Sequence, residues 1–447
     1  MTELNKGSEL QRLLVEAVRH HNVLPLTGRC NLSCLFCSHR YNPPDTRAYS
    51  FGPLSAERLS ELAAYLDPGK KIIIGESATR LREGEPLTHP RFMDLLKELR
   101  ARYPKTMIQV TTNGTLLRDQ VIAELANLQP LELILSVNSI SSEGRKQLMG
   151  DPDPENIIRL IDLLAEKQIN FHGSVVAMTR LVGFADLRQT LLYLDRKGAK
   201  SIRLLMPGFT RLADPDLISR EDDSRRVYQM VEELQQVFSA PLLPEPPLIN
   251  GLQPLVAGVI RESAAESAGF KSGDLILAVG GQVPFSRVDA YDLLTERENP
   301  TVRVRRDQQI LTLTILKAVH ESSGAALSYD LDPRQLQQVR VSMDRQGKNL
   351  MLLSFPALKR WQIAGKLRGL NDLIMLPVQS QWFGGTINCA GLLTVSDFQA
   401  ALDGVEDLQD YRKILLPAVA FDRSGNDLRG FHYLTLNSQG IPMQLID

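Results

Sequence analysis

The stretch Cys30-Asn31-Leu32-Ser33-Cys34-Leu35-Phe36-Cys37 holds three of the four cysteines of this 447-residue chain. Thiolates placed this close together can ligate three irons of an iron–sulfur cluster, because Cys is the usual protein ligand of such clusters. A zinc site is the alternative on ligand spacing, since His39 could supply a fourth ligand next to the three thiols. The stretch therefore predicts a metal centre held by Cys30, Cys34 and Cys37.

The three cysteines could also lie on one face of a helix as small buried apolar residues, because their spacings are four and three. Gly28, Asn31 and Ser33 interrupt that helical pattern, and the apolar run Val23–Thr27 before them is typical of a strand. We therefore expect a loop that follows a first strand.

Strand-like and helix-like patterns alternate over the first half of the chain. The expected strands are residues 23–27, 71–74, 107–111, 133–137, 175–178 and 201–205. The expected helices are residues 10–18, 55–66, 90–103, 118–128, 155–167, 186–197 and 223–238. Such alternation predicts an α/β fold with parallel βαβ units, and chemistry is then expected on loops at the carboxyl ends of the strands.

The Cys-x-x-x-Cys-x-x-Cys spacing, with Phe36 before the last Cys and a strand before the first, resembles the signature of the radical S-adenosylmethionine (radical SAM) enzymes. The resemblance implies a partial (β/α)6 barrel and a 4Fe–4S cluster with one iron left open for S-adenosylmethionine. It further implies reductive cleavage of that cofactor, hydrogen abstraction from a substrate, and an electron donor such as flavodoxin or ferredoxin.

Further loops on the same edge resemble the family's cofactor site. Glu83-Gly84-Glu85-Pro86 is similar to the family's Gly-Gly-Glu-Pro motif, which receives the methionine amino group, although Glu83 replaces the first Gly. Glycine allows close backbone approach, and a carboxylate suits an ammonium group. The resemblance makes seven residues candidates for cofactor binding: Phe36, Gly84, Glu85, Pro86, Asn113, Ser136 and Asn138.

The amino-acid composition limits the partners and the cellular location that we expect for this protein. The chain has 51 Lys and Arg against 52 Asp and Glu, so its net charge of −1 indicates no nucleic-acid partner. No apolar run approaches the ~20 residues of a membrane span, and we find no signal core at the N-terminus. The cysteines do not form a disulfide framework, so we expect a cytoplasmic protein.

The middle of the chain has a different pattern. Ser263–Asp274, an apolar run over 275–279 and Gly280-Gly281 together resemble a PDZ domain, for which we predict residues 250–318. PDZ domains bind extended peptides by strand addition, so a protein partner is expected. Gly251–Leu255, the segment expected to bind a peptide carboxylate, contains Pro254, which lacks a backbone donor. A structural or docking role is therefore an equal expectation.

The last part of the chain, residues 332–447, is predicted to form a mixed α/β domain. Trp382–Thr394 resembles the cyanobacterial-type iron–sulfur oxidoreductases, whose C-terminal domain has no assigned reaction and whose PDZ-like segment precedes the cluster motif. Cys389 is a candidate catalytic residue, as a donor of a hydrogen atom. The usual burial of free Cys favours a structural role for it instead.

These observations predict an enzyme with a radical SAM barrel over residues 1–240, followed by the two domains described above. Its substrate, a small molecule or a peptide, is not specified by the residues. An iron–sulfur protein for electron transfer or redox sensing is one alternative. A PDZ-centred interaction protein on a degenerate barrel is another, but neither role requires a loop that binds an ammonium group.

Overall fold

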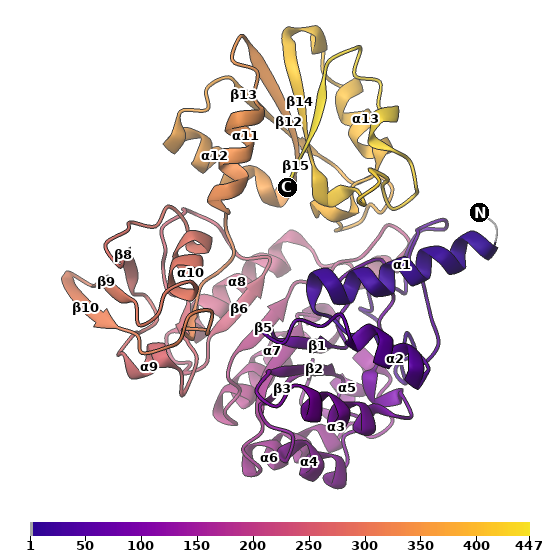
Figure 1. The fold of residues 1–447 in the computed structure, drawn as a ribbon, viewed down its shortest axis with the longest axis vertical. Helices are drawn as coiled ribbons and strands as arrows, with labels where there is room; N and C mark the ends of the chain where they lie inside the picture. Colours follow the sequence, from indigo (N-terminus) through magenta and orange to yellow (C-terminus); the bar gives the residue numbers. More distant parts are fainter. Residues whose placement is uncertain (1–2) are drawn as a thin grey trace. The chain divides into compact units, whose positions relative to one another are not determined.

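The computed structural model describes residues 3–447 (Figure 1). The chain divides into two compact units. The first contains the chain up to Arg40 together with Arg47–Pro207 and Ser219–Met230. The second contains Tyr41–Thr46, Gly208–Ile218 and Val231–Asp447.

One sheet has six strands in the order β1-β2-β3-β4-β5-β6. The strands are β1 Ile72–Ile74, β2 Ile108–Thr112, β3 Leu131–Ser136, β4 Asn170–Val176, β5 Ile202–Leu205 and β6 Leu242–Glu245. The pairs from β1–β2 through β4–β5 are parallel. This sequential order confirms the predicted α/β fold with a partial barrel.

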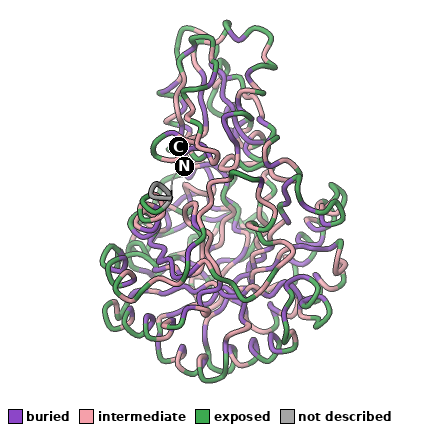
Figure 2. Tube along the Cα trace, turned by 90° about the vertical axis from the view of Figure 1, so that its right-hand side faces the viewer, coloured by how far each residue is buried: buried purple, intermediate pink, exposed green. Residues whose placement is uncertain are grey.

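Helices separate these strands, and all of them except α5 overlap a helix that the apolar periodicity predicts. They are α1 Glu3–His21, α2 Ala56–Ala63, α3 Phe92–Arg102, α4 Asp119–Ala126, α5 Ser142–Met149, α6 Asn156–Glu166, α7 Thr179–Arg196 and α8 Glu221–Gln235. Ser55 and Ser141 cap α2 and α5 by accepting hydrogen bonds from backbone amides of the first turn. The buried residues that carry this packing are purple along the trace in Figure 2.

One strand assigned from sequence is wrong and one strand was not predicted, and both cases involve proline. The segment 23–27 forms only an isolated bridge, between Val23 and Ile73, because Pro25 lacks the amide that a longer ladder needs. The barrel predicted over residues 1–240 ends too early, because the Pro-dense stretch 240–247 contains β6. Because β6 lies at the edge of the sheet, Pro244 is tolerated there.

The PDZ-like region is a small β-rich body. Its elements are β7 Gly258–Val259, α9 Ala264–Ser267, β8 Leu275–Val279, α10 Arg287–Thr295, β9 Thr301–Arg306, β10 Gln309–Thr314 and β11 Ala325–Ala326. The strands form one sheet in the order β10-β9-β8 and a separate β11-β7 pair. Gly280 and Gly281 both have positive φ after β8, which confirms the expected turn.

The C-terminal region contains both helices and strands, as predicted, and its sheet is parallel. It contains α11 Pro333–Ser342, β12 Lys348–Ser354, α12 Phe355–Arg368, β13 Leu373–Val378, α13 Val395–Asp403, β14 Tyr411–Pro417 and β15 Met443–Ile446. Its sheet has the order β13-β12-β14-β15, with every pair parallel. Alternate residues of β12 enter two hydrophobic cores, so both faces of this sheet are covered.

Short 3-10 helices complete the described chain: η1 Pro86–Thr88, η2 Pro215–Leu217, η3 Ala390–Leu392, η4 Leu408–Asp410, η5 Ala418–Ala420 and η6 Tyr433–Thr435. None of the helices over residues 3–447 is both long enough and apolar enough to cross a membrane.

Candidate functional site

The cysteine stretch is a loop held against the end of α5. The backbone amides of Ser33 and Leu35 donate to the carbonyls of Met149 and Leu148, at 3.2 and 2.9 Å. The amide of Cys37 donates to the carbonyl of Cys34 at 3.2 Å, which makes a tight turn between these two ligand candidates. The prediction of a loop, and not of a helix, is therefore confirmed.

The three thiols of this loop lie close enough to influence one another. Cys30 and Cys37 are exposed and Cys34 is half-buried. Burial, together with the negative charges of Cys30 and Cys37, raises the pKa of Cys34 to about 12, while Arg145 opposes the rise. Within residues 3–447, no three His, Cys, Asp or Glu side chains already stand in a metal-binding arrangement. The donor set still fits an iron–sulfur cluster, because three neighbouring soft thiolates need a shared cation.

Glu85 connects three loops at the carboxyl end of the sheet. Its carboxylate accepts hydrogen bonds from Thr112 Oγ1 at 2.7 Å, from the Asn113 amide at 2.7 Å and from the Leu87 amide at 3.3 Å. Burial raises the pKa of Glu85, and these hydrogen bonds oppose the rise. A carboxylate has about four acceptor sites, so three internal bonds leave room for one further donor.

Gly84 occupies a position that only glycine can fill. A Cβ built on Gly84 would lie 1.9 Å from the carbonyl oxygen of Arg29, just before Cys30. The Gly84 and Glu85 amides donate to the carbonyls of Thr27 and Arg29, at 2.9 and 2.8 Å. Gly84 thus allows a close backbone approach between its own loop and the cysteine loop.

Asn113 joins the loop after β2 to the cysteine loop. Its Nδ2 donates to Asn31 Oδ1 at 3.0 Å and lies 4.0 Å from Cys30 Sγ. Asn31 Nδ2 in turn donates to Thr115 Oγ1 at 2.7 Å. The structure therefore brings together Cys30, Glu85 and Asn113, three of the residues predicted from sequence.

The other four candidates for cofactor binding are not part of the hydrogen-bonded group around Glu85 and Asn113. Phe36 is half-buried in the cysteine loop, and Pro86 is buried at the start of η1. Ser136 ends β3, and Asn138 follows it with a φ of +61°. Asn138 is 2% exposed, and its amide group bonds the Val176 amide at 2.9 Å and Met149 Sδ at 3.3 Å. Contacts from these four residues to a cofactor stay predictions.

Arg145 is a site residue that the sequence reading missed. It lies on α5, is 1% exposed and donates to the carbonyls of Asn113 at 2.6 Å and Val137 at 2.7 Å. A third carbonyl, that of Ser136, accepts at 3.2 Å, and Asp151 pairs with the guanidinium. Arg145 therefore holds the ends of β2 and β3 next to the cysteine loop. The only feature of the sequence that could have drawn attention to Arg145 is its place in the first turns of a helix capped by Ser141.

Glu83, the departure from the family motif, is a second buried acid near the motif glycine. Its Oε1 is buried and has no hydrogen-bond partner among the described residues. Burial raises the pKa of Glu83 to about 8, and only the Leu26 backbone opposes the rise. An acid in this state becomes ionised readily when a cation arrives beside it.

Cys389 lies in the second unit, where it caps η3. The cysteine is exposed, so the expected burial is wrong. The residues before it form a local pairing: the Arg211 amide donates to the Phe383 carbonyl at 2.7 Å, and the Thr386 amide donates to the Phe209 carbonyl at 2.8 Å. This pairing fixes the backbone ahead of Cys389 and leaves the cysteine at the surface.

Gly251–Leu255 of the PDZ-like region is packed against the C-terminal domain. That stretch forms no strand, and Leu252 is buried in a core with residues of the C-terminal domain such as Trp361. The strand that pairs with β7 is β11, from the far end of the module. Whether Gly251–Leu255 binds a peptide carboxylate stays a prediction.

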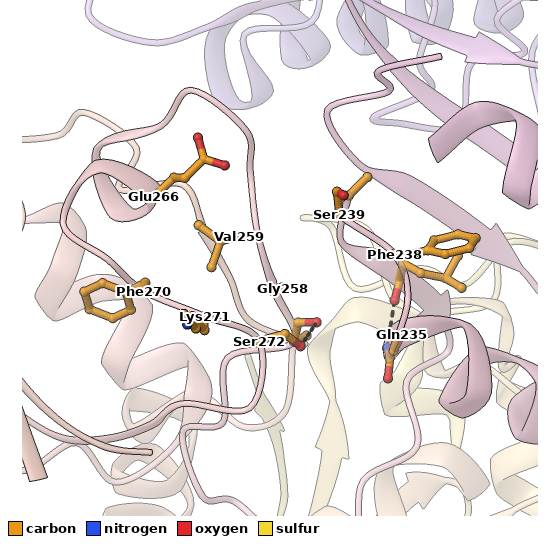
Figure 3. A pocket seen from close by; sticks show the side chains of 12 residues that line it. Gln235, Phe238, Ser239, Gly258, Val259, Glu266, Phe270, Lys271 and Ser272 are labelled. Carbon is orange, nitrogen blue, oxygen red and sulfur yellow. Dashed lines mark hydrogen bonds between the residues drawn. The ribbon is translucent and has the colours of Figure 1, made fainter. Parts of the chain in front are cut away.

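A pocket of about 240 Å³ lies beside β7 (Figure 3). Gln235 and Phe238, from the end of α8 onward, line one side, and Val259, Phe270 and Lys271 of the module line the other. Gln235 Nε2 donates to the Leu242 carbonyl at 3.0 Å, so this amide already has a protein partner. The contacts of the pocket assign it no ligand.

The site geometry defines a class: a thiolate loop at the carboxyl edge of a parallel sheet, joined to a Gly-Glu-Pro loop. Residues 24–191 match the radical SAM superfamily, and residues 255–306 match the PDZ domain. The chain carries a radical SAM superfamily domain followed by a PDZ domain. The likeness of its C-terminal domain to the cyanobacterial-type group stays a prediction.

Similar proteins agree with this class. The chain is 34% identical over 110 residues to the tungsten-containing aldehyde ferredoxin oxidoreductase cofactor-modifying protein of Pyrococcus furiosus, covering 24% of this chain and 27% of that one. It is 29% identical over 126 residues to the FeMo cofactor biosynthesis protein NifB of Chlorobaculum tepidum, covering 27% and 28%. The matches thus span about a quarter of the length of these two relatives.

Among solved structures, the chain resembles Streptococcus suis SuiB bound to S-adenosylmethionine. The identity is 17%, the TM-score is 0.37, and the match covers 55% of this chain and 56% of SuiB.

Proposed function

We propose that this chain is a radical SAM enzyme whose 4Fe–4S cluster is held by Cys30, Cys34 and Cys37. Such a cluster, when bound, supplies the electron that breaks S-adenosylmethionine into methionine and a 5′-deoxyadenosyl radical, which abstracts hydrogen from a substrate. A reducing cytoplasmic location and a flavodoxin or ferredoxin as electron donor belong to the same proposal. The substrate is a small molecule or a peptide that the site does not specify.

The observation that carries the proposal is the hydrogen-bonded connection between the thiolate loop and the acid. Asn31 of the cysteine loop accepts from Asn113, and the amide of Asn113 donates to Glu85. A ligand that touches the cysteine loop therefore lies within reach of a buried carboxylate and of the Gly84 backbone. An amino acid cofactor with a cationic amino group suits that arrangement, because charge-assisted hydrogen bonds to a carboxylate are among the strong ones.

In this proposal each residue of the chain has a defined task. Glu85 orders the loop and offers its remaining acceptor site to the ammonium group, while Gly84 allows the backbone to come close. Glu83 supplies a second negative charge once a cation is bound nearby. Arg145 keeps the Asn113 loop and the end of β3 in position and adds a buried positive charge near Cys34.

Metal analysis of anaerobically reconstituted protein tests the first step. We expect about four irons per chain with visible iron–sulfur absorption, and loss of that absorption when any one of Cys30, Cys34 or Cys37 becomes Ala. The matched control is Cys389→Ala, which should keep the full iron content. Stoichiometric zinc in place of iron would instead support a zinc site, with His39 as the fourth ligand to examine.

Iron content together with S-adenosylmethionine binding separates the two alternatives. An electron-transfer or redox-sensing protein would hold the cluster but would not bind S-adenosylmethionine, so Glu85→Ala would change nothing. A PDZ-centred interaction protein would hold no cluster. The internal arrangement of Glu85 and Gly84 beside the cysteine loop supports the enzyme over both.

Cys389 as a hydrogen donor is a further part of the proposal, supported by its exposure. Cys389→Ala should reduce turnover of the native substrate while leaving thermal stability unchanged, because an exposed thiol contributes little packing. A loss of stability with normal turnover would show a structural thiol.

A further inference from the structure

The order of strands reverses in the C-terminal sheet. β12 is followed by α12 and then by β13 on one side of β12, and the chain returns through α13 to β14 on the other side. In open parallel sheets, ligands bind outside the carboxyl ends of the strands where the order reverses in this way. That place is the gap between the ends of β12 and β14.

A cavity of about 120 Å³ lies at this position. Its walls come from the ends of β12, β14 and β15 and from the first two turns of α12, and they include the apolar Trp361 and Leu416. Four polar residues also line it: Gln335, Ser354, Arg360 and Asp447. A dry engineered cavity of about 150 Å³ holds one benzene molecule, so this one accommodates an apolar body of about five carbon atoms.

Ser354 is a buried polar residue at the cavity. It is the last residue of β12 and the N-cap of the 14-residue helix α12, and it is 3% exposed. Unlike Ser55 and Ser141, it makes no side-chain cap on the amides of its helix. Because its hydroxyl does not cap the helix, it is available to hydrogen-bond a ligand in the cavity.

Arg360, in the second turn of α12, is a largely buried cation without a carboxylate bound to it. Its Nη1 donates to the backbone carbonyl of Asp330 at 3.1 Å, and its buried Nε has no acceptor within the described chain. The Asp330 carboxylate is bound elsewhere, since it accepts from Arg287 Nη1 at 3.1 Å and from the Arg287 amide at 3.0 Å. Because an incompletely paired buried charge is costly, a counter-ion is expected in the cavity.

We propose that this cavity binds a small monocarboxylate, whose acid group pairs with Arg360 and Ser354 and whose apolar chain packs on Trp361 and Leu416. The positive end of the α12 dipole favours an anion at Ser354, although Pro356 removes one amide donor from the first turn. Asp447 on the same cavity repels a second negative charge, so the site selects a monoanion over phosphate. This site is separate from the proposed radical chemistry and does not depend on it.

Tryptophan fluorescence gives a direct assay, because the chain has only two Trp residues. In the full-length Trp382→Phe variant, Trp361 in the cavity wall is the single reporter. Pentanoate should produce a saturable change in its emission, whereas the neutral pentanamide should produce none. Inorganic phosphate should bind at least tenfold more weakly than pentanoate.

Substitutions in this background test the named residues. Arg360→Gln should weaken pentanoate at least tenfold, since a hydrogen bond to a charged group is worth about 1.5–3 kcal/mol. Ser354→Ala should weaken it about two- to tenfold. Lys359→Gln is the matched control, because it removes an exposed charge from the neighbouring position of the same helix and should leave affinity unchanged.

Val419→Phe is a second test of the cavity for the case in which the Arg360→Gln protein does not fold. Val419 lines the cavity and is 68% exposed, so a larger residue fits at the surface but should obstruct the cavity and weaken pentanoate. The proposal fails if pentanoate gives no saturable change, if pentanamide or phosphate binds as tightly, or if a folded Arg360→Gln or Val419→Phe protein binds normally.

Discussion

Replacing Arg145 by Met removes the cation that holds the loops of the candidate site. The change leaves the Asp151 carboxylate, 1% exposed, without its ion-pair partner, and it deprives three backbone carbonyls of a donor. Met has a similar length and no charge, so packing is largely retained while the hydrogen bonds are lost.

The structure sets the size of the effect. Breaking a buried ion pair by removing one partner costs about 3–5 kcal/mol, because the other charge stays buried and unpaired. Asp151→Asn in the same chain should recover about 1–2 kcal/mol, since the remaining side chain is then neutral and still accepts from the Asp153 amide. The three carbonyls keep the double variant less stable than the natural chain.

Hydrogen exchange measured by mass spectrometry is the appropriate assay, because a chain with several domains has no single unfolding free energy. The amides of Ser33 and Leu35 donate to the end of the helix that carries Arg145, so their protection reports local opening. Arg145→Met should reduce that protection at least a hundredfold, which corresponds to about 3 kcal/mol.

Arg159→Met is the matched control, because its pair with Asp119 is exposed and such pairs contribute about 0–1 kcal/mol. Protection in Arg145→Met that stays within a factor of five of this control would refute the role assigned to Arg145. So would a double variant with Asp151→Asn that is less protected than Arg145→Met alone.

Three further predictions follow from single positions. Because the pKa of Glu83 is raised from 4.5 to about 8, the ligand-free chain should lose thermal stability between about pH 5 and pH 8; Glu83→Gln should remove that part of the slope, and equal slopes would contradict the burial argument. Gly385 has a φ of +61°, and a Cβ built on it would lie 2.2 Å from the Phe209 carbonyl oxygen. Gly385→Ala should therefore break the backbone pairing between the segments around Phe209 and Phe383 and increase proteolysis near residue 385. The control Gly391→Ala should not, because a Cβ there would meet nothing closer than 3.6 Å. Glu85→Ala should weaken S-adenosylmethionine about ten- to a hundredfold in equilibrium dialysis with iron content retained, and unchanged affinity would remove Glu85 from the cofactor site.

Much of the barrel could be predicted because apolar periodicity distinguishes half-buried helices from short buried strands. Alternation also predicted that Cys30, Glu85 and Asn113 meet, since loops after neighbouring parallel strands share one edge. Proline accounts for two errors in the predicted strands. Pro25 lacks a backbone donor, so residues 23–27 do not form a continuous strand. Pro244 also lacks this donor, but it is tolerated because β6 lies at the edge of the sheet.

What the sequence could not show depends on contacts far apart in the chain. α5 has a weak apolar pattern, so neither the helix nor Arg145 was predicted. The role of Arg145 depends on its hydrogen bonds to three backbone carbonyls on other segments, which no local pattern indicates. The pairing of Phe383 with Arg211 joins residues 172 positions apart without any local signal. The cavity beside Ser354 likewise follows from strand order, which residue patterns alone do not give.

The central claim is that the chain cleaves S-adenosylmethionine at the cluster of the cysteine loop. The most direct test is the quantification of 5′-deoxyadenosine after anaerobic reconstitution, chemical reduction and addition of S-adenosylmethionine. The account predicts 5′-deoxyadenosine and methionine in equal amounts from the natural chain and none from Cys34→Ala. A fully reduced protein with about four irons per chain that releases no 5′-deoxyadenosine would contradict it.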